Sequence, residues 1–317
     1  MTDWVTYVTG QVSTAALGPL HDIGTVLHSQ GPDAVPWDDV AERVHAVLLR
    51  GEAMDAGRIS DAPHLRIVAR HGAGHDSVDV AAARAHGVAV TTTPGANARS
   101  VAEHAVALLL AVARQVGEAD RLVRAGDWRT GRRVLMGREL SGGTLGVIGF
   151  GTIGRETARI AGAGFGMRVR AYDPYVSAAD MRSLGVEPVG TVEEVLSSCE
   201  HVSLHLPAAP DGGHLLDDAR LALVPEGTII VNTARGVLVD HDALADALDR
   251  GQVGGAGLDV TDPEPLPEGH RLFDHPRVVV TPHLGGQTHQ SMERVAETAV
   301  ACIVAAREGR AIPHRVV

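Results

Sequence analysis

Hydrophobic residues recur along the chain in two patterns, short continuous runs and helical spacing, and together these patterns predict its secondary structure. Short apolar runs bounded by glycine, proline or polar residues are typical of buried strands. In the first part of the chain such runs fall at 4–8, 46–49, 65–69 and 88–92. From the middle onward they fall at 144–148, 167–172, 201–206, 228–233, 255–260 and 277–281. Segments with apolar residues at helical spacing lie between most of these runs. This alternation of strands and helices indicates α/β domains with doubly wound parallel sheets.

Two longer apolar patterns predict helices. Residues 99–123 carry Val101, Leu108 and Val112 near helical spacing, on a wide apolar face. We expect one helix there that connects two domains and packs against a second subunit, and burial inside one domain is the alternative. Residues 288–308 predict a C-terminal helix that can return to the N-terminal domain.

A glycine-rich turn, Gly149-x-Gly151-x-x-Gly154, lies between strand 144–148 and the helical residues after it. In such a corner the glycines permit a tight turn, close approach of backbone amides to a pyrophosphate, and close packing of helix on strand. The helix N-terminus adds partial positive charge. Asp173, nineteen positions beyond Gly154, ends the next strand. There it can bind the ribose hydroxyls of an adenosine and repel a 2′-phosphate, so the sequence predicts NAD over NADP.

Length and charge limit the function further. The chain has 317 residues, enough for two domains. Its net charge of −11, with basic residues scattered, argues against a nucleic-acid partner. All 28 basic residues are arginine. The absence of lysine excludes Schiff-base and pyridoxal chemistry, a P-loop, and the Tyr-x-x-x-Lys pair of short-chain reductases.

Other features concern the compartment. The longest apolar run, 105–113, is far shorter than the roughly 20 residues of a membrane span. Residues 1–8 do not have the pattern of a secretion signal. Cys199 and Cys302 form neither a disulfide framework nor a metal-ligand spacing. We therefore expect a cytoplasmic protein without a membrane partner or a metal.

Polar residues follow three of the later predicted strands. Arg235, Glu264 and His283 each come shortly after a strand end, and Glu264 stands in a proline-rich loop. Ligands of doubly wound sheets bind outside the carboxyl ends of the strands. We expect these three segments to converge there.

These residues belong to longer motifs. The motifs are His71-Gly-Ala-Gly74-His-Asp-Ser-Val-Asp79, Asn97-Ala-Arg-Ser-Val101-Ala-Glu103, Gly149-Phe-Gly151-Thr-Ile-Gly154, Asn232-Thr-Ala-Arg235-Gly236, Gly257-Leu-Asp259 with Pro263-Glu264-Pro265, and Pro282-His283-Leu-Gly. With them, residues 44–317 resemble the D-isomer-specific 2-hydroxyacid dehydrogenase family. The resemblance implies a flavodoxin-like substrate domain made of 1–97 and 285–317, and a Rossmann NAD-binding domain at 98–284.

The chemistry of such a reaction suits the three polar residues. Hydride transfer to a 2-keto carbon needs a proton donor for the developing alkoxide, and histidine titrates near neutral pH. Glu264 is expected to orient His283 and to raise its pKa. Arg235 offers a planar fork for the substrate carboxylate and for the growing charge on the keto oxygen. The family assigns the same roles to the matching positions.

The resemblance also implies the remaining contacts of a small 2-keto or 2-hydroxy acid and of NAD. The predicted substrate contacts are Arg50, Arg235, His283 and the backbone amides of Ala73 and Gly74. The predicted cofactor contacts are Gly149, Gly151, Thr152, Ile153, Gly154, Asp173, Val101, Pro207, Thr233, Ala234 and Asp259. For Val101, Pro207 and Asp259 ordinary packing is the alternative. His104 is expected to be a hydrogen-bonded structural residue.

The chain departs from the family pattern after His205. Where the family usually has two threonine hydroxyls, this chain has Ala209 and Gly212, which leaves hydroxyl contacts to the cofactor open. Glu264 argues against the formate dehydrogenases of the family, which have glutamine there. A corepressor-like sensor that binds NAD(H) without turnover is the alternative function. We expect a homodimer.

An arginine cluster bears on the substrate. Arg129, Arg132, Arg133 and Arg138 follow the predicted long helix. They would suit a phosphate or a second carboxylate of the substrate, across a dimer interface. A solvated loop is the favoured alternative.

Overall fold

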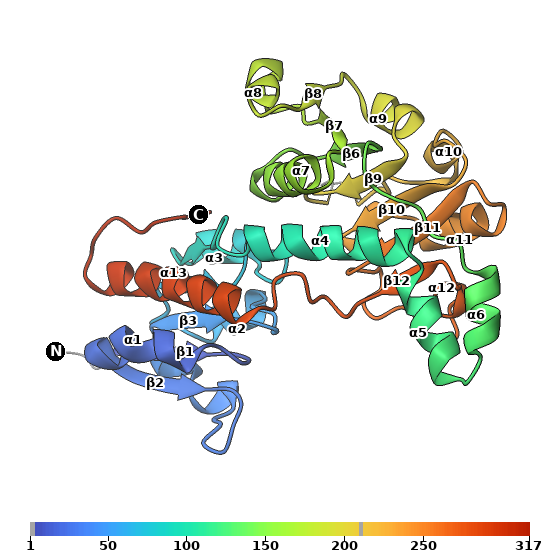
Figure 1. Ribbon diagram of the computed structural model, residues 1–317. Coiled ribbons are helices and arrows are strands. Elements are labelled where there is room, and N and C mark those ends of the chain that lie inside the picture. Colours follow the sequence, from blue (N-terminus) through green and yellow to red (C-terminus); the bar gives the residue numbers. More distant parts are fainter. Residues whose placement is uncertain (1–3, 209–211) are drawn as a thin grey trace. The chain divides into compact units, whose positions relative to one another are not determined.

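The computed structural model describes residues 4–208 and 212–317, which form two compact units (Figure 1). Unit 1 is Met1–Asn97 with Gly286–Val317, and unit 2 is Ala98–Gly285. Within the described residues, unit 1 has a five-stranded sheet and unit 2 a seven-stranded sheet, and every strand pair is parallel. The predicted fold class, two doubly wound parallel-sheet domains, is therefore confirmed.

In unit 1 the strand order is β2-β1-β3-β4-β5, the flavodoxin-like order. Its strands are β1 (Trp4–Val8), β2 (Gly24–His28), β3 (Ala46–Leu49), β4 (Ile67–Arg70) and β5 (Ala89–Thr91). Its helices are η1 (Thr14–Leu17), α1 (Gly18–Ile23), η2 (Trp37–Asp39), η3 (Ala41–Arg43), α2 (Ala56–Ser60), α3 (Val80–Ala85) and α13 (His289–Arg307). Helix α13 packs on the sheet through Ala299, Cys302 and Ile303, so the chain's C-terminal part completes this unit (Figure 1).

In unit 2 the order is β12-β11-β10-β9-β6-β7-β8, the Rossmann order extended by one strand. Its strands are β6 (Thr144–Ile148), β7 (Arg168–Tyr172), β8 (Glu187–Pro188), β9 (His201–Leu204), β10 (Thr228–Asn232), β11 (Val253–Leu258) and β12 (Val278–Val280). Its helices are α4 (Ala98–Ala113), α5 (Val116–Arg124), α6 (Trp128–Val134), α7 (Thr152–Phe165), α8 (Ala178–Ser183), α9 (Val192–Ser198), α10 (Asp218–Leu221), η4 (Gly236–Leu238), α11 (His241–Asp249) and α12 (Arg271–Asp274).

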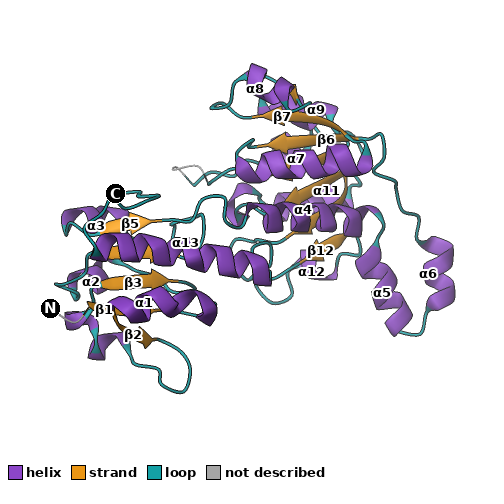
Figure 2. Cartoon of the chain, turned by 60° about the vertical axis from the view of Figure 1, so that its left-hand side comes forward, coloured by secondary structure: helices purple, strands orange, loops and turns teal. Residues whose placement is uncertain are grey.

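The central strands of unit 2 are apolar on both faces because helices cover both. Along β10, Ile229 and Val231 join one apolar cluster and Ile230 joins the other, as alternating side chains of a strand must. Helices α4 and α7 cover the first face and lie side by side over the strands (Figure 2). The core therefore lies on both sides of the sheet and leaves its strand ends for polar loops.

The single helix predicted over 99–123 is wrong. The structure has α4 and α5, separated at Gln115, whose φ of 52° lies in the left-handed region. The Arg138 amide donates to the Ala113 carbonyl (2.8 Å), and Gln115 Nε2 donates to the Met136 carbonyl (2.6 Å). These contacts cap α4 from residues that lie beyond α6. The apolar face of α4 packs inside unit 2, which was the alternative, and its contact with a second subunit stays a prediction.

Smaller differences concern short elements. Strand β2 was not predicted, because its apolar run of two residues, Val26 and Leu27, is brief and only half-buried at the sheet edge. The two-residue strand β8 was also missed, and several strand ends shift by one or two residues. None of the helices in the described part of the chain has the length and apolar character that crossing a bilayer requires. Cys199 and Cys302 are buried free thiols.

Candidate active site

The glycine-rich corner joins β6 to α7 at the point where the strand order of unit 2 reverses. Gly149 has a φ of +91°, and a Cβ there would lie 2.5 Å from the His205 carbonyl oxygen in the loop after β9. A Cβ at Gly154 would lie 2.1 Å from the Gly149 oxygen. Both distances are far inside van der Waals contact. These two glycines are therefore required by the packing of the corner itself.

Gly151 differs from its neighbours. Its φ of −72° and ψ of −162° suit any residue, and a Cβ there would meet no atom of the described residues within 4 Å. It precedes Thr152 and Ile153, the first residues of α7, and has no side chain to cap the first-turn amides. Open space in front of these amides and the positive end of a 14-residue helix fit a dinucleotide pyrophosphate.

Asp173 follows β7 beside this corner. One carboxylate oxygen accepts from the Phe150 amide (2.7 Å) and the other from the Tyr175 amide (2.8 Å). Each oxygen keeps a further lone pair, so the carboxylate is oriented and can still accept from ribose hydroxyls. The contact with Phe150 ties Asp173 directly to the glycine-rich turn.

Arg235 is projected by a turn that Asn232 builds after β10. The buried Asn232 side chain donates to the Arg235 carbonyl (2.8 Å) and accepts from the Ala234 amide (3.0 Å). The half-buried guanidinium donates to the Ala234 carbonyl (2.7 Å). At Gly236 a Cβ would lie 2.0 Å from the Thr261 carbonyl, so this turn is pressed against the loop that follows β11.

Glu264 and His283 form a hydrogen-bonded pair in unit 2. Glu264 Oε1 lies 2.8 Å from His283 Nδ1, and the two side chains are 45% and 55% exposed. Thr261 Oγ1 donates to the Pro263 carbonyl (2.9 Å) and so holds the loop that carries Glu264. The pair is an acid beside an imidazole that can reach solvent or a ligand, as proton transfer requires.

Asp259 organises the segment that carries His283. Its side chain is 2% exposed and accepts from Thr281 Oγ1 (2.6 Å) and from the Leu284 (2.7 Å) and Gly285 (2.8 Å) amides. Burial opposes ionisation of this carboxyl. Hydrogen bonds from His104, Thr281 and the two amides outweigh burial and hold the Asp259 pKa below its usual value. Its predicted contact with the cofactor stays a prediction.

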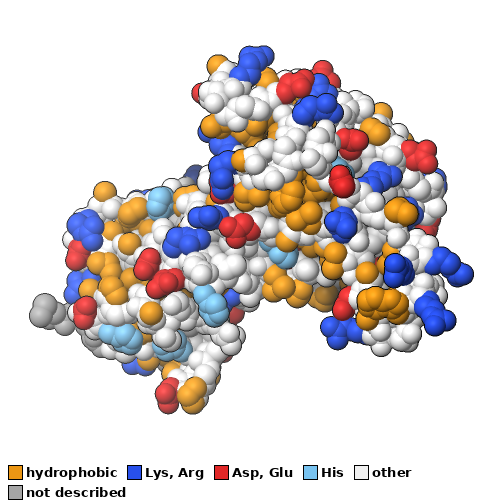
Figure 3. All heavy atoms as spheres, viewed as in Figure 1, with side chains coloured by type: hydrophobic (Ala, Val, Ile, Leu, Met, Phe, Trp, Pro, Cys, Tyr) orange, Lys and Arg blue, Asp and Glu red, His pale blue; other side chains and the backbone are white. Residues whose placement is uncertain are grey.

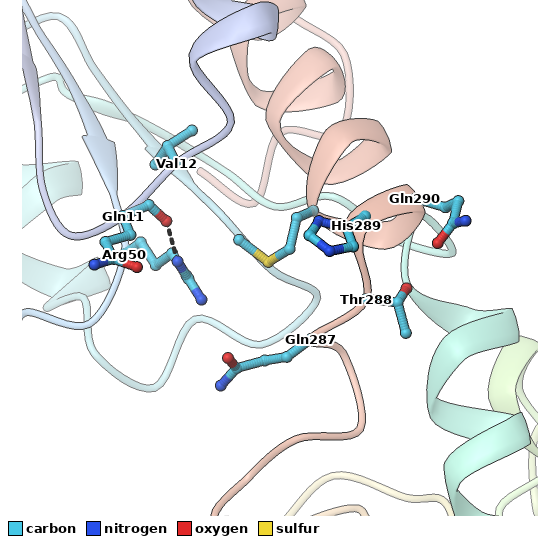
Figure 4. Close-up of a pocket in the computed structure, with 8 residues that line it drawn as sticks. Gln11, Val12, Arg50, Gln287, Thr288, His289 and Gln290 are labelled. Atoms are coloured by element: carbon cyan, nitrogen blue, oxygen red, sulfur yellow. Dashed lines mark hydrogen bonds between the residues drawn. The ribbon is translucent and has the colours of Figure 1, made fainter.

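In unit 1 the residues predicted to bind substrate follow the carboxyl ends of two strands. Arg50 follows β3, and the loop after β4 contains exposed Ala73 and half-buried Gly74. Arg50 lines a cavity of about 510 Å³ together with residues from the start of α13, including Thr288 and His289 (Figure 4). Its Nη1 donates to the Gln11 carbonyl.

The other predicted cofactor contacts lie in unit 2 with varied surroundings. Val101 packs near Gly285, Pro207 is exposed, and Ala234 is half-buried. Thr233 is buried, and among the described residues its hydroxyl has no hydrogen-bond partner. Gly212 is described, with a φ of +70°, whereas Ala209 lies outside the described residues.

Two other histidines are poor proton donors. Burial, with Arg50 nearby, lowers the pKa of His71 to about 4, and burial lowers the pKa of His205 to about 4. Both imidazoles are neutral at physiological pH, and His205 is bound to Ser203 Oγ (2.8 Å). His104, expected to be structural, is hydrogen-bonded to Asp259 and Thr281.

The arginine cluster divides into two parts. Arg138 donates to the Gly227 carbonyl (3.0 Å) and so fixes the loop before β10. Arg129, Arg132 and Arg133 are exposed on α6. In Figure 3 blue side chains stand beside orange ones at the lower right, where α5 and α6 lie.

Gly236 and Thr281 contribute to the site although neither was predicted to do so. Gly236 allows the close contact of two strand-end loops, and Thr281 joins Asp259 to the segment of His283. Gly236 follows the predicted Arg235 directly, which was a usable signal for a close approach. Thr281 stands 22 residues from Asp259, so no local pattern reveals their contact.

The glycine-rich corner, the Rossmann strand order and the acid–histidine pair define unit 2 as a dinucleotide-binding domain of oxidoreductase type. Residues 106–285 match the family model described as D-isomer specific 2-hydroxyacid dehydrogenase, NAD binding domain. The chain belongs to this family, and NAD is the cofactor of the matched domain. The resemblance drawn from the motifs is thereby confirmed.

Individual relatives agree. The chain is 43% identical over 308 residues to a D-3-phosphoglycerate dehydrogenase of Mycobacterium leprae, covering 96% of this chain and 57% of that protein. It is 40% identical over 272 residues to a glyoxylate reductase of Korarchaeum cryptofilum, covering 85% and 81%. The crystal structure of the TT0316 protein from Thermus thermophilus superposes with a TM-score of 0.86 at 38% identity, covering 99% of this chain and 100% of that chain. The chain thus spans little more than half the length of the mycobacterial relative.

Proposed function

We propose that this protein interconverts small 2-keto acids and D-2-hydroxy acids with NAD as cofactor. Bound NAD supplies or accepts the hydride. The observation that carries the proposal is the 2.8 Å contact between Glu264 Oε1 and His283 Nδ1, with the loop of Glu264 packed against the turn that carries Arg235. An acid–imidazole pair together with a guanidinium from an adjoining turn suits the reduction of a carbonyl next to a carboxylate.

Each residue has one task in this proposal. His283 donates a proton to the developing alkoxide through Nε2 and takes one back in the reverse direction, while Glu264 holds Nδ1. Arg235 binds the substrate carboxylate and stabilises the charge that grows on the keto oxygen. The neutral states of His71 and His205 support the choice of His283 as proton donor.

Two relatives bear on the choice of substrate. One is named D-3-phosphoglycerate dehydrogenase and another glyoxylate reductase. We infer that Arg50, which lines the cavity of about 510 Å³ in unit 1, contacts an anionic substrate. Burial lowers the pKa of Arg50, but a guanidinium stays charged at neutral pH. Ala73 and Gly74 remain the predicted amide contacts for the substrate.

The test is turnover with matched variants. Purified protein is assayed for NADH oxidation with glyoxylate and with other 2-keto acids of different charge, and for NAD reduction with D-3-phosphoglycerate. His283→Asn should lose turnover about 100-fold or more while NADH still binds. His21→Asn, at an exposed histidine of α1, is the control and should keep wild-type rates. Wild-type kcat in His283→Asn would refute the assignment.

The alternative is an NAD(H)-binding sensor of the corepressor kind. It predicts tight NADH binding with no turnover of any acid in the same screen. The acid–histidine pair alone does not exclude it. Glu264, His283 and Arg235 together suit either role, whereas relatives named dehydrogenase and reductase favour the enzyme.

A homodimer in a reducing cytoplasm completes the proposal. Large apolar side chains are exposed on α5, on α6 and just after it. They are Val116, Val123, Trp128, Val134 and Met136. Apolar side chains this exposed favour a protein partner, and a second copy of the chain satisfies them symmetrically. The two unpaired thiols favour the reducing compartment.

A further inference from the structure

His104 joins helix α4 to the loops that follow β11 and β12. Its Nε2 lies 3.1 Å from Asp259 Oδ1 and 3.0 Å from Thr281 Oγ1, and its side chain is 21% exposed. All three residues belong to unit 2. The imidazole therefore crosses from a helix on the sheet face to the strand ends where the acid–histidine pair lies.

The chemistry of the partners decides which group donates. An ionised Asp259 only accepts, and the one proton of Thr281 is used in its 2.6 Å bond to Asp259 Oδ1. Nε2 of His104 must therefore carry a hydrogen, which it shares between the carboxylate and the hydroxyl oxygen. This defines the tautomer that a neutral His104 adopts.

The carboxylate that His104 supports holds the backbone of the next segment. Asp259 accepts from the Leu284 and Gly285 amides through its side chain, and its carbonyl accepts from the His283 amide (2.9 Å). His283 has a φ of 54°, in the left-handed region that non-glycine residues rarely adopt. A backbone in that region persists where surrounding contacts enforce it.

We propose that His104 is a positioning residue, whose Nε2–H fixes Asp259 and Thr281 and thereby the backbone that presents His283 to Glu264. The inference rests on the proposed function for its effect on turnover. Its effect on the backbone of residues 283–285 is independent of that function. A histidine of purely local importance would stabilise α4 without reaching this segment.

The experiment compares variants that keep or remove the donor. His104→Phe keeps a ring without the N–H, His104→Leu is a second apolar variant, and His104→Gln restores an amide donor. His201→Leu, at a buried histidine of β9, is the matched control. Amide hydrogen exchange of residues 283–285 is followed by mass spectrometry, beside NADH affinity and kcat.

Loss of the donor should act on the backbone and on turnover but not on cofactor binding. In His104→Phe, exchange at Leu284 and Gly285 should rise about tenfold or more, because their acceptor is loosened. Turnover should fall about 10- to 100-fold with NADH affinity within about twofold, since small misplacements of a proton donor are costly. His104→Gln should recover both, and His201→Leu should change neither.

Two results would overturn the proposal. One is wild-type exchange at residues 283–285 in both apolar variants. The other is a loss in His104→Gln as large as in His104→Phe, because the donor would then be irrelevant. If the wild-type protein turns over no acid, the proposed function fails, whereas the exchange measurement still decides the role of His104.

Discussion

The open space at Gly151 leads to a prediction that separates cofactor binding from folding. Gly151→Ala adds one methyl group where no atom of the described residues lies within 4 Å, at backbone angles that alanine adopts freely. The folded protein should therefore be as stable as the wild type, or more stable by about 0.4–1 kcal/mol through the unfolded chain. The methyl group would, however, occupy the space in front of the α7 amides.

The cost to NADH binding follows from the contacts that the methyl group displaces. One or two hydrogen bonds from amides to a charged pyrophosphate are each worth about 1.5–3 kcal/mol. Losing one of them raises the dissociation constant about 10- to 100-fold. Fluorescence titration with NADH measures this change, and thermal unfolding followed by circular dichroism without cofactor measures stability.

Gly154→Ala is the matched comparison, because its Cβ would lie 2.1 Å from the Gly149 oxygen. Backbone oxygen cannot rotate away, so α7 must shift, and overpacking of this kind costs about 1–3 kcal/mol. The reasoning is refuted if Gly151→Ala binds NADH like the wild type. It is also refuted if Gly151→Ala melts as early as Gly154→Ala, since the open space would then be filled in solution.

Three further predictions test other parts of the molecule. Asp259 has a folded pKa below its unfolded value, so its stabilisation is full above about pH 4 and is lost as pH falls through the folded pKa. The urea midpoint of Asp259→Asn should accordingly lie below that of the wild type at neutral pH and approach it in acid. A difference between the two midpoints that stays constant with pH would contradict this pH dependence. Glu264→Gln keeps an oxygen for His283 but removes the charge, and kcat with a 2-keto acid should fall about tenfold or more; an unchanged kcat–pH profile would count against the pair. Trp128→Glu places a charge on the exposed α5–α6 face, and sedimentation should then show monomers, whereas an intact dimer would remove this face from the interface.

The sequence predicted most of what is local. The spacing of Gly149, Gly151 and Gly154 is typical of a strand-to-helix corner, and the structure has these residues at such a corner. Asp173 directly follows the next strand, β7. Strands buried on both faces are continuous apolar runs, so their positions were found to within one or two residues. The contact of His283 with Glu264 was expected from chemistry and is present at 2.8 Å. Their catalytic roles stay predictions.

The features that sequence could not supply depend on distant partners. No glycine or proline directly follows α4 to mark its end in the sequence. The helix is capped instead by the Arg138 amide, which stands 25 residues further on and donates to the Ala113 carbonyl. His104 was expected to be structural because a histidine in an apolar helix usually is. Its partner Asp259 stands 155 residues away, so its link to the segment of His283 appears only in the folded chain.

The two parts of the site in unit 2 meet opposite structural requirements. At the glycine-rich corner, glycine leaves the space in front of the backbone amides free of side chains, because these amides must face a large anion. At the ends of β10, β11 and β12 it adds buried polar contacts instead: Asn232 shapes one turn, Gly236 presses it on the next loop, and Asp259 holds the third. Loops after parallel strands lack the backbone hydrogen bonds of a sheet. Buried carboxylates and amides supply hydrogen bonds to these loops instead. Under the proposed function, the geometry of Arg235 and His283 therefore depends on residues that need not touch the substrate.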